Sequence, residues 1–285
     1  METAALVESI VERLQRVDGV TAIVLGGSRA RGTHTARSDV DLGIYYHPDQ
    51  PLDLKALDQL AAELDDRHVS GLLTPIGGWG PWINGGGWLT VQAQPVDFLY
   101  RDLSRAAACI EACCSGQVEI VYQPGHPHGF VSSIYMAEVA LCRILWEADG
   151  RLSALKRRTQ PYPEPLQRAL LAKFAWEIDF SLRIARKAVE RADVAYAAGC
   201  CFRCTACLLQ VLFALNEHYW MNEKGAVALA ETFPVRPPML QARIERAFTL
   251  LAATPLSLEE AIAVLEELSR ETERLVAGTT RASRE

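Results

Sequence analysis

The stretch Val20-Thr21-Ala22-Ile23-Val24-Leu25-Gly26-Gly27-Ser28 decides the fold of the N-terminal half. Its first six residues form an almost continuous apolar run rich in β-branched side chains, which is typical of a buried strand. The glycine pair permits a sharp turn that can bring backbone N–H groups and the Ser28 hydroxyl close to a phosphate. Gly26, Gly27 and Ser28 are therefore candidate phosphate-binding residues, although this motif alone is more often a plain turn.

The neighbouring segments predict an α/β (α+β) domain with a mixed sheet. Apolar side chains recur at helical spacing over residues 4–17, and Asp18-Gly19 ends that pattern. We predict a second strand over 40–46, a helix over 54–64, and two short strands over 88–92 and 96–100 that a tight turn at 93–95 joins.

The second half of the chain has a different character. Helical periodicity covers residues 131–147, 166–190, 194–220, 239–252 and 258–276, and no strand is expected there. A stretch rich in proline, glycine and histidine at 123–129 marks the boundary. We predict two domains, a catalytic domain over 1–125 and an all-α helical-bundle domain over 126–285. Ser257 and Glu260 are typical of a capping box that opens the last helix.

Charge and composition favour some partners over others. The net charge of −6 argues against an extended nucleic-acid surface and suits a small cationic acceptor. The chain begins without a signal-peptide pattern, and apolar runs such as 208–215 are too short to cross a bilayer, so we expect a cytoplasmic protein without membrane association. The oligomeric state is left open.

The eight cysteines are expected to be reduced thiols, because disulfide frameworks belong to short secreted chains. Cys200, Cys201, Cys204 and Cys207 lie close together in the sequence. A zinc site is the weaker hypothesis for them, since one helix face cannot surround an ion tetrahedrally. Small apolar fillers of a helix core are the favoured interpretation.

Three carboxylates carry the chemistry. Asp39 and Asp41 lie two residues apart in Ser38-Asp39-Val40-Asp41-Leu42, so on a strand they project from one face. Two parallel carboxylates repel each other, which leaves a solvated strand end or a Mg²⁺ site as interpretations. Asp97 lies inside an otherwise apolar strand and needs a partner there, with Arg101 or Arg105 as the structural alternative to a metal ion.

In combination, the Gly-Gly-Ser turn, the Asp-Val-Asp strand and the distant Asp97 resemble the DNA polymerase β-type nucleotidyltransferase superfamily. The resemblance covers roughly residues 20–101. The long form, from Gly26 through Leu42, looks most like the small bacterial branch that includes aminoglycoside nucleotidyltransferases and antitoxin-type protein adenylyltransferases.

This resemblance implies a Mg²⁺-dependent enzyme that uses ATP or another nucleoside triphosphate. Asp39 and Asp41 would hold one Mg²⁺ at the β- and γ-phosphates, and with Asp97 they would hold a second ion beside the α-phosphate. An acceptor hydroxyl would attack the α-phosphorus in line, and pyrophosphate would leave. Arg29 and Ser38 are further candidates for nucleotide binding, and Arg31 and Arg37 flank the same loop.

The general base stays open between Asp97 and a glutamate of the helical half. Glu138, Glu147 and Glu177 lie on predicted helices, and each is also explained as a solvated helix residue. Lys224 closes a polar, aromatic segment that resembles the part of such helical domains that binds the nucleotide. It is our candidate triphosphate contact, and a cation at the C-terminus of a helix is the alternative.

Two other groups have open roles. His126 and His128 flank the predicted domain boundary, where a surface loop is the plain interpretation and a lining of the cleft the other. Trp79, Trp82 and Trp88 accompany a glycine-rich segment and could stack on a base or a sugar, or form a lid packed on the core.

Three functions remain as hypotheses. The first is transfer of a nucleoside monophosphate to a hydroxyl of a small, aminoglycoside-like acceptor. The second is an antitoxin-type transfer to a protein or an RNA end, for which a protein acceptor is possible and a nucleic acid is not expected. The third is a non-catalytic nucleotide sensor.

Overall fold

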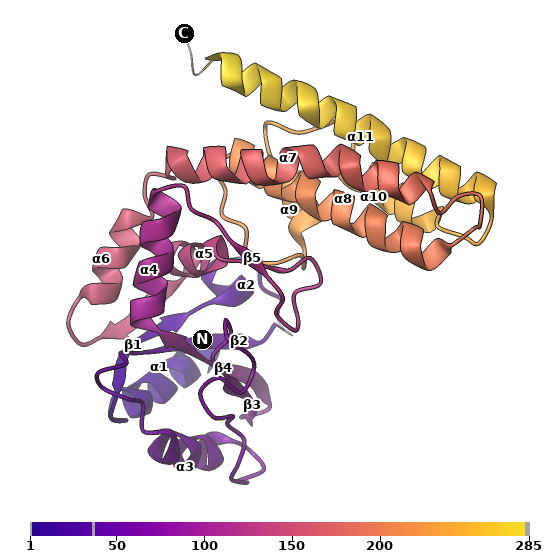
Figure 1. The fold of residues 1–285 in the computed structure, drawn as a ribbon. Coiled ribbons are helices and arrows are strands. Elements are labelled where there is room, and N and C mark those ends of the chain that lie inside the picture. The colour runs from indigo at the N-terminus through magenta and orange to yellow at the C-terminus, as the bar shows by residue number, and fades with distance from the viewer. Residues whose placement is uncertain (1, 36–37, 283–285) are drawn as a thin grey trace. The chain divides into compact units, whose positions relative to one another are not determined.

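The computed structural model describes residues 2–35 and 38–282, and the chain forms two compact units (Figure 1). Unit 1 comprises Met1–Ala112, Glu119–Gly125 and Phe130–Pro161. Unit 2 comprises Cys113–Val118, His126–Gly129 and Tyr162–Glu285.

Unit 1 combines strands with helices. Its strands are β1 (Val20–Leu25), β2 (Val40–Tyr46), β3 (Gly86–Val91), β4 (Gln94–Asp102), β5 (Ile120–Val121), β6 (Phe130–Val131) and β7 (Arg143–Glu147). Its helices are α1 (Glu2–Leu14), α2 (Gly27–Ala30), α3 (Leu54–Leu64), most of α4 (Leu103–Cys114), α5 (Ser133–Leu141) and α6 (Arg151–Arg158).

The main sheet has the strand order β3-β4-β2-β1-β7. Strands β2 and β4 are parallel, and the other neighbours are antiparallel, so the predicted mixed sheet is confirmed. Side chains alternate between the two faces of a strand. Leu42 of β2 and Phe98 of β4 are fully buried in a core that α1 and α3 also line, with Ile10 and Leu57. Asp41 and Asp97 therefore project from the opposite face.

The predicted helix over 131–147 is wrong in its second half, as is the expectation that no strand follows residue 130. Helix α5 ends at Leu141, and residues 143–147 form β7, which pairs with β1 at the edge of the sheet. Without β7, the backbone groups along that edge of β1 would lack these hydrogen bonds. Residues 130–161 pack within unit 1, while the domain limits 1–125 and 126–285 stay a prediction.

Unit 2 is mainly helical, as predicted. Its helices are α7 (Glu164–Arg186), α8 (Val194–Leu215), α9 (Ala226–Ala230), α10 (Leu240–Thr249) and α11 (Pro255–Ala282). The expected capping box at Ser257 is wrong. The Ser257 N–H donates to Thr254 Oγ1 instead, and Pro255 takes the first helical position, where its missing N–H costs nothing.

Helix α8 is the central helix of unit 2, and it packs against α7, α10 and α11. Among the described residues it alone is long and apolar enough to cross a membrane, and most of it is buried within the protein. Cys201, Cys204 and Cys207 are buried in α8. Burial raises the pKa of each thiol, to about 12 for Cys201. These cysteines therefore behave as small apolar side chains of the core.

Candidate functional site

Two of the predicted carboxylates are neighbours across the sheet. Strands β2 and β4 run parallel, and Asp41 is the register partner of Asp97. Adjacent strands lie about 4.8 Å apart, so both half-buried side chains start from neighbouring points on the same face. Only the pairing of β2 with β4 brings these residues together, because 55 residues separate them in the sequence.

The glycine turn packs directly against Asp41. Gly26 N–H donates to the Asp41 carbonyl at 2.8 Å, which fixes the end of β1 beside β2. Gly27 has a φ of +58°, and a Cβ at this position would lie 1.8 Å from Asp41 Oδ2. The Asp41 carboxylate thus occupies the space that any side chain at 27 would need. Helix α2 begins at Gly27 and carries Ser28 in its first turn.

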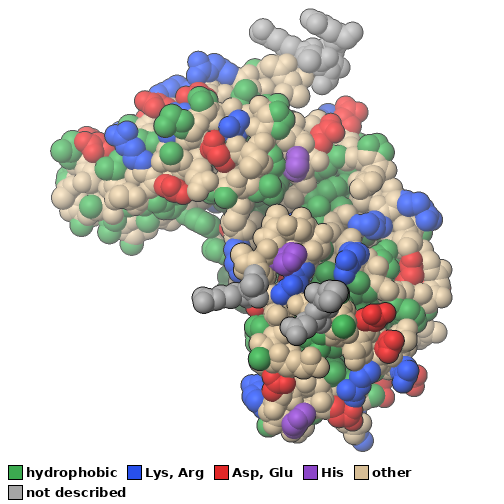
Figure 2. Space-filling view, turned by 180° about the vertical axis from the view of Figure 1, so that it is seen from behind, with side chains coloured by type: hydrophobic (Ala, Val, Ile, Leu, Met, Phe, Trp, Pro, Cys, Tyr) green, Lys and Arg blue, Asp and Glu red, His purple; other side chains and the backbone are tan. Residues whose placement is uncertain are grey.

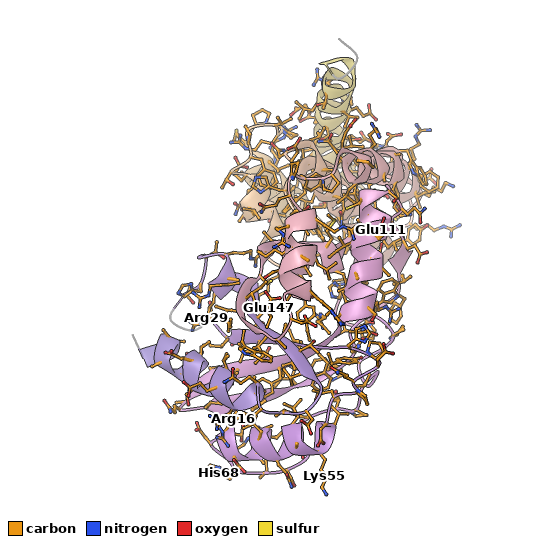
Figure 3. All side chains as sticks on the ribbon, turned by 90° about the vertical axis from the view of Figure 1, so that its left-hand side faces the viewer. Arg16, Arg29, Lys55, His68, Glu111 and Glu147 are labelled. Carbon is orange, nitrogen blue, oxygen red and sulfur yellow. The ribbon has the colours of Figure 1, made fainter. Side chains whose placement is uncertain are left out.

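Arg29 ties α2 to the loop before β2 (Figure 3). Its Nη2 donates to the Ser38 carbonyl at 2.7 Å, and its Nε donates to the Asp39 carbonyl at 3.0 Å. Gln94 Nε2 donates to the same Ser38 carbonyl at 3.1 Å. Asp39 itself is exposed just ahead of β2. Arg29 holds the backbone that carries the first carboxylate, and its predicted contact with the nucleotide stays a prediction.

Of the other two arginines of this loop, the structure describes Arg31. Arg31 Nε donates to the Gly27 carbonyl at 3.2 Å. Arg37 lies outside the described residues. Gln94 was not expected as part of this site, and its position directly after a turn gives no local signal for it.

The donor set at this place is made of carboxylate oxygens, the ligands that Mg²⁺ prefers. Asp41 and Asp97 share a face of the sheet, and Asp39 stands two residues before Asp41. Within residues 2–35 and 38–282, no group of three or more His, Cys, Asp or Glu side chains is gathered closely enough to hold a metal ion. The fit to a divalent cation therefore rests on the pair Asp41 and Asp97, and Asp39 would have to turn toward them.

The glutamates considered as general bases each have a structural partner. Arg101 Nε and Nη2 donate to the two carboxylate oxygens of Glu138, each at 2.6 Å. Glu147 lies on β7 and not on a helix (Figure 3), and it accepts hydrogen bonds from the backbone N–H and the hydroxyl of Ser153. These contacts give both glutamates a role in joining elements of unit 1.

The third of them, Glu177, belongs to a partly buried network in unit 2. Arg203 Nε and Nη2 donate to its carboxylate at 2.5 and 2.7 Å. Burial by itself would raise the pKa of Glu177, but the hydrogen bonds and charge of Arg203 outweigh it and lower that pKa. Arg203 is an internal anchor that sequence analysis missed.

His128 belongs to the same network, so the surface-loop interpretation is wrong for it. Its side chain is buried, and Arg203 Nη1 approaches its Nδ1 at 3.0 Å. Its backbone N–H donates to Glu223 Oε1 at 2.7 Å. Burial and then the charge of Arg203 lower the pKa of His128 to about 4. His128 is therefore neutral near pH 7.

Lys224 lies beyond the long helix that the sequence suggested it would end. Helix α8 stops at Leu215, and Lys224 is exposed in the turn that precedes α9. Its backbone N–H donates to Asn222 Oδ1 at 3.0 Å. A cation at the C-terminus of α8 is thus ruled out as its role, while the triphosphate contact stays a prediction.

The three tryptophans of the glycine-rich segment divide into two roles. Trp82 packs against Phe130 and Tyr135, and the Arg105 guanidinium lies 4.5 Å from its ring centroid. Trp79 and Trp88 instead stack on each other with ring centroids 4.6 Å apart, and Trp88 is 63% exposed. The lid interpretation holds for Trp82 and not for the other two.

Two models of known protein families match parts of the chain. Residues 7–72 match the family described as the nucleotidyltransferase domain. This part of the chain is similar to a nucleotidyltransferase domain. The matched region includes the glycine turn and both Asp39 and Asp41, while Asp97 lies beyond it. A second model, described as a domain of unknown function (DUF4037), matches residues 131–224 of the same chain.

Solved structures give a weaker likeness, and 11 chains match. One is a nucleotidyltransferase-like protein from Exiguobacterium sibiricum 255-15, with 13% sequence identity and a TM-score of 0.43. The match covers 97% of this chain and 80% of that one. No curated protein sequence matches the chain. The family match gives residues 7–72 a likeness to a nucleotidyltransferase domain, and substrate and acceptor are not determined.

Proposed function

We propose that the chain transfers a nucleoside monophosphate, AMP from ATP in the first instance, to a hydroxyl of a small acceptor. The observation that carries this proposal is the register of β2 and β4, which sets Asp41 beside Asp97 next to the Gly26-Gly27 turn. A cation site and a turn for the phosphates then adjoin one another, as the transfer of a phosphoryl group requires.

The residues of the chain would divide the work. The Gly26-Gly27-Ser28 turn would position the triphosphate, because neither glycine carries a side chain that would obstruct a phosphate. Asp41 and Asp97, joined by Asp39, would hold Mg²⁺, which supplies positive charge against the charge that develops during transfer. Asp97 would also accept the proton of the acceptor hydroxyl, because the candidate glutamates of unit 1 are engaged in contacts with Arg101 and Ser153.

A small acceptor agrees with the surface better than RNA does. Figure 2 shows Lys and Arg side chains intermixed with Asp and Glu over the described residues of the face in view. Binding of a nucleic acid needs a clustered basic surface that neutralises several phosphates. The net charge of −6 points the same way. A protein acceptor and a non-catalytic sensor are the competing proposals, and the following experiment separates them.

The test is transfer of label from α-labelled ATP in the presence of Mg²⁺ and a panel of hydroxylated small molecules. We expect label on a small acceptor, and loss of that label on addition of EDTA and in Asp41→Asn and Asp97→Asn. Asp49→Asn is the matched control, since this exposed carboxylate follows the far end of β2. The proposal is wrong if label appears only on a protein of a cell lysate, or if ATP binds without any transfer.

A further inference from the structure

The pair formed by the exposed Trp88 and the half-buried Trp79 lies next to the carboxylates. Trp88 on β3 is the register partner of Asp97 on β4, and side chains of register partners point to the same face of a sheet. The neighbouring β3 residues Leu89 and Val91 lie in the core behind the sheet, which confirms that Trp88 faces the side of Asp97 and Asp41. With Trp79 stacked on it, Trp88 presents an aromatic surface beside the site.

The order of the strands fixes which side of the site this surface occupies. Across the sheet, the glycine turn follows β1, Asp41 is on β2, Asp97 is on β4 and Trp88 is on β3. The tryptophans and the glycine turn therefore lie on opposite sides of the two carboxylates. In an in-line transfer, the attacking oxygen and the leaving phosphate also stand on opposite sides of the phosphorus. If the turn holds the leaving phosphates, the tryptophans lie on the side from which the acceptor arrives.

Hydrogen bonds at Trp79, Trp82 and Asn84 hold the segment that carries Trp79 in place. Gln123 Nε2 donates to the Trp79 carbonyl at 2.5 Å, and Gln123 Oε1 accepts from Trp82 N–H at 3.3 Å. Asn84 Nδ2 donates to the Tyr46 hydroxyl at 2.6 Å. Together with the packing of Trp82, these bonds make the pair a preformed surface. A preformed aromatic surface binds a ring with little loss of conformational entropy.

We propose that the Trp79–Trp88 pair is the acceptor subsite, where the flat face of a ring of the acceptor stacks on the indole of Trp88. The inference rests on the proposed function, and it specifies the acceptor as a hydroxylated ring compound. An indole face attracts cations, which favours a ring that also carries an ammonium group. An amino sugar and an aromatic amine share this chemistry.

The experiment measures binding by calorimetry with two probes, kanamycin for amino sugars and tyramine for aromatic amines. Loss of one stacked ring costs about 1.4 kcal/mol, so the Kd of the probe that binds should rise about tenfold in Trp88→Ala. The Kd of that probe should rise less in Trp88→Phe, and Trp79→Ala should also weaken its binding. The Kd for ATP should be unchanged in all three variants.

Trp176→Ala is the matched control, since Trp176 is 60% exposed and lies in unit 2 beside Phe180. It should bind both probes as the unchanged protein does. The inference is overturned if neither probe binds, if Trp88→Ala leaves the probe Kd unchanged, or if it weakens ATP to the same degree. Labelled transfer separates this outcome from the proposed function. Transfer with an unchanged KM for the acceptor in Trp88→Ala removes the subsite alone, whereas no transfer by the unchanged protein removes the function.

Discussion

At the scale of single residues, the most constrained position of the site is Gly27. The sequence already singled out the glycine pair, but it did not distinguish its two members. The structure does, because a Cβ at Gly27 would meet the Asp41 carboxylate at 1.8 Å, whereas a Cβ at Gly26 would stay 3.7 Å from its nearest neighbours. Gly26 also has an extended backbone that alanine adopts readily.

We therefore predict opposite outcomes for two alanine substitutions. Gly27→Ala should displace the Asp41 carboxylate and lower the rate of nucleotidyl transfer about 100-fold or more, because small displacements of reacting groups cost that much. Gly26→Ala should keep the rate within a few-fold. Initial rates with α-labelled ATP measure both, and circular dichroism checks that both variants fold. Equal loss of activity in the two variants would contradict a role for the contact between Gly27 and Asp41.

At the scale of elements, the ion pair between β4 and α5 explains why Glu138 is not needed as a base. Arg101 is 6% exposed and sits in the interior, where an unpaired charge is costly. Glu138 binds it through two hydrogen bonds, and Arg101 Nη1 also donates to the Tyr100 carbonyl at 2.9 Å. The pair fastens α5 onto the face of the sheet from which Asp97 projects.

Removing Glu138 should therefore lower the stability of the protein. Any loss of transfer activity should follow only from that loss of stability. Breaking one partner of a buried ion pair typically costs about 3 kcal/mol or more, which is the expected loss in Glu138→Ala. Glu111→Ala is the control, since Glu111 forms an exposed pair with Arg158 that is worth less than about 1 kcal/mol. Urea denaturation measures both. A Glu138→Ala protein of normal stability that has lost transfer activity would restore Glu138 as the general base.

At the scale of the whole molecule, burial of His128 makes stability depend on pH. Its pKa is about 4 in the folded protein and about 6.5 in an unfolded chain, so the unfolded chain binds a proton first as the pH falls. The stabilisation is complete above pH 6.5 and is lost between 6.5 and 4. The shift corresponds to about 3 kcal/mol of unfolding free energy over that interval.

We predict that His128→Asn flattens this dependence. Denaturation by urea at pH 7 and pH 4, followed by the helical circular-dichroism signal, should show a drop in the original protein about 3 kcal/mol larger than in the variant. His68→Asn is the control, because His68 is exposed and its positive φ of 51° suits asparagine. A drop of the same size in all three proteins would show that His128 does not titrate as its burial implies.

Much of the fold was predictable because it follows local patterns. The buried strand before Gly26, the alternation around Asp41 and the long helices of unit 2 repeat with the period of their own element. Residues 143–147 were assigned wrongly for the same reason. Their apolar side chains fit a helix pattern equally well, and only the free edge of β1 made them a strand.

The sequence by itself determined the glycine turn and the three carboxylates, since these are properties of short segments. Only the tertiary structure decided which of them meet. Parallel pairing of β2 with β4 sets Asp41 beside Asp97, and pairing of β3 with β4 adds Trp88 to the same face. Strand order and register come from burying one face of the whole sheet, a condition that no local segment contains.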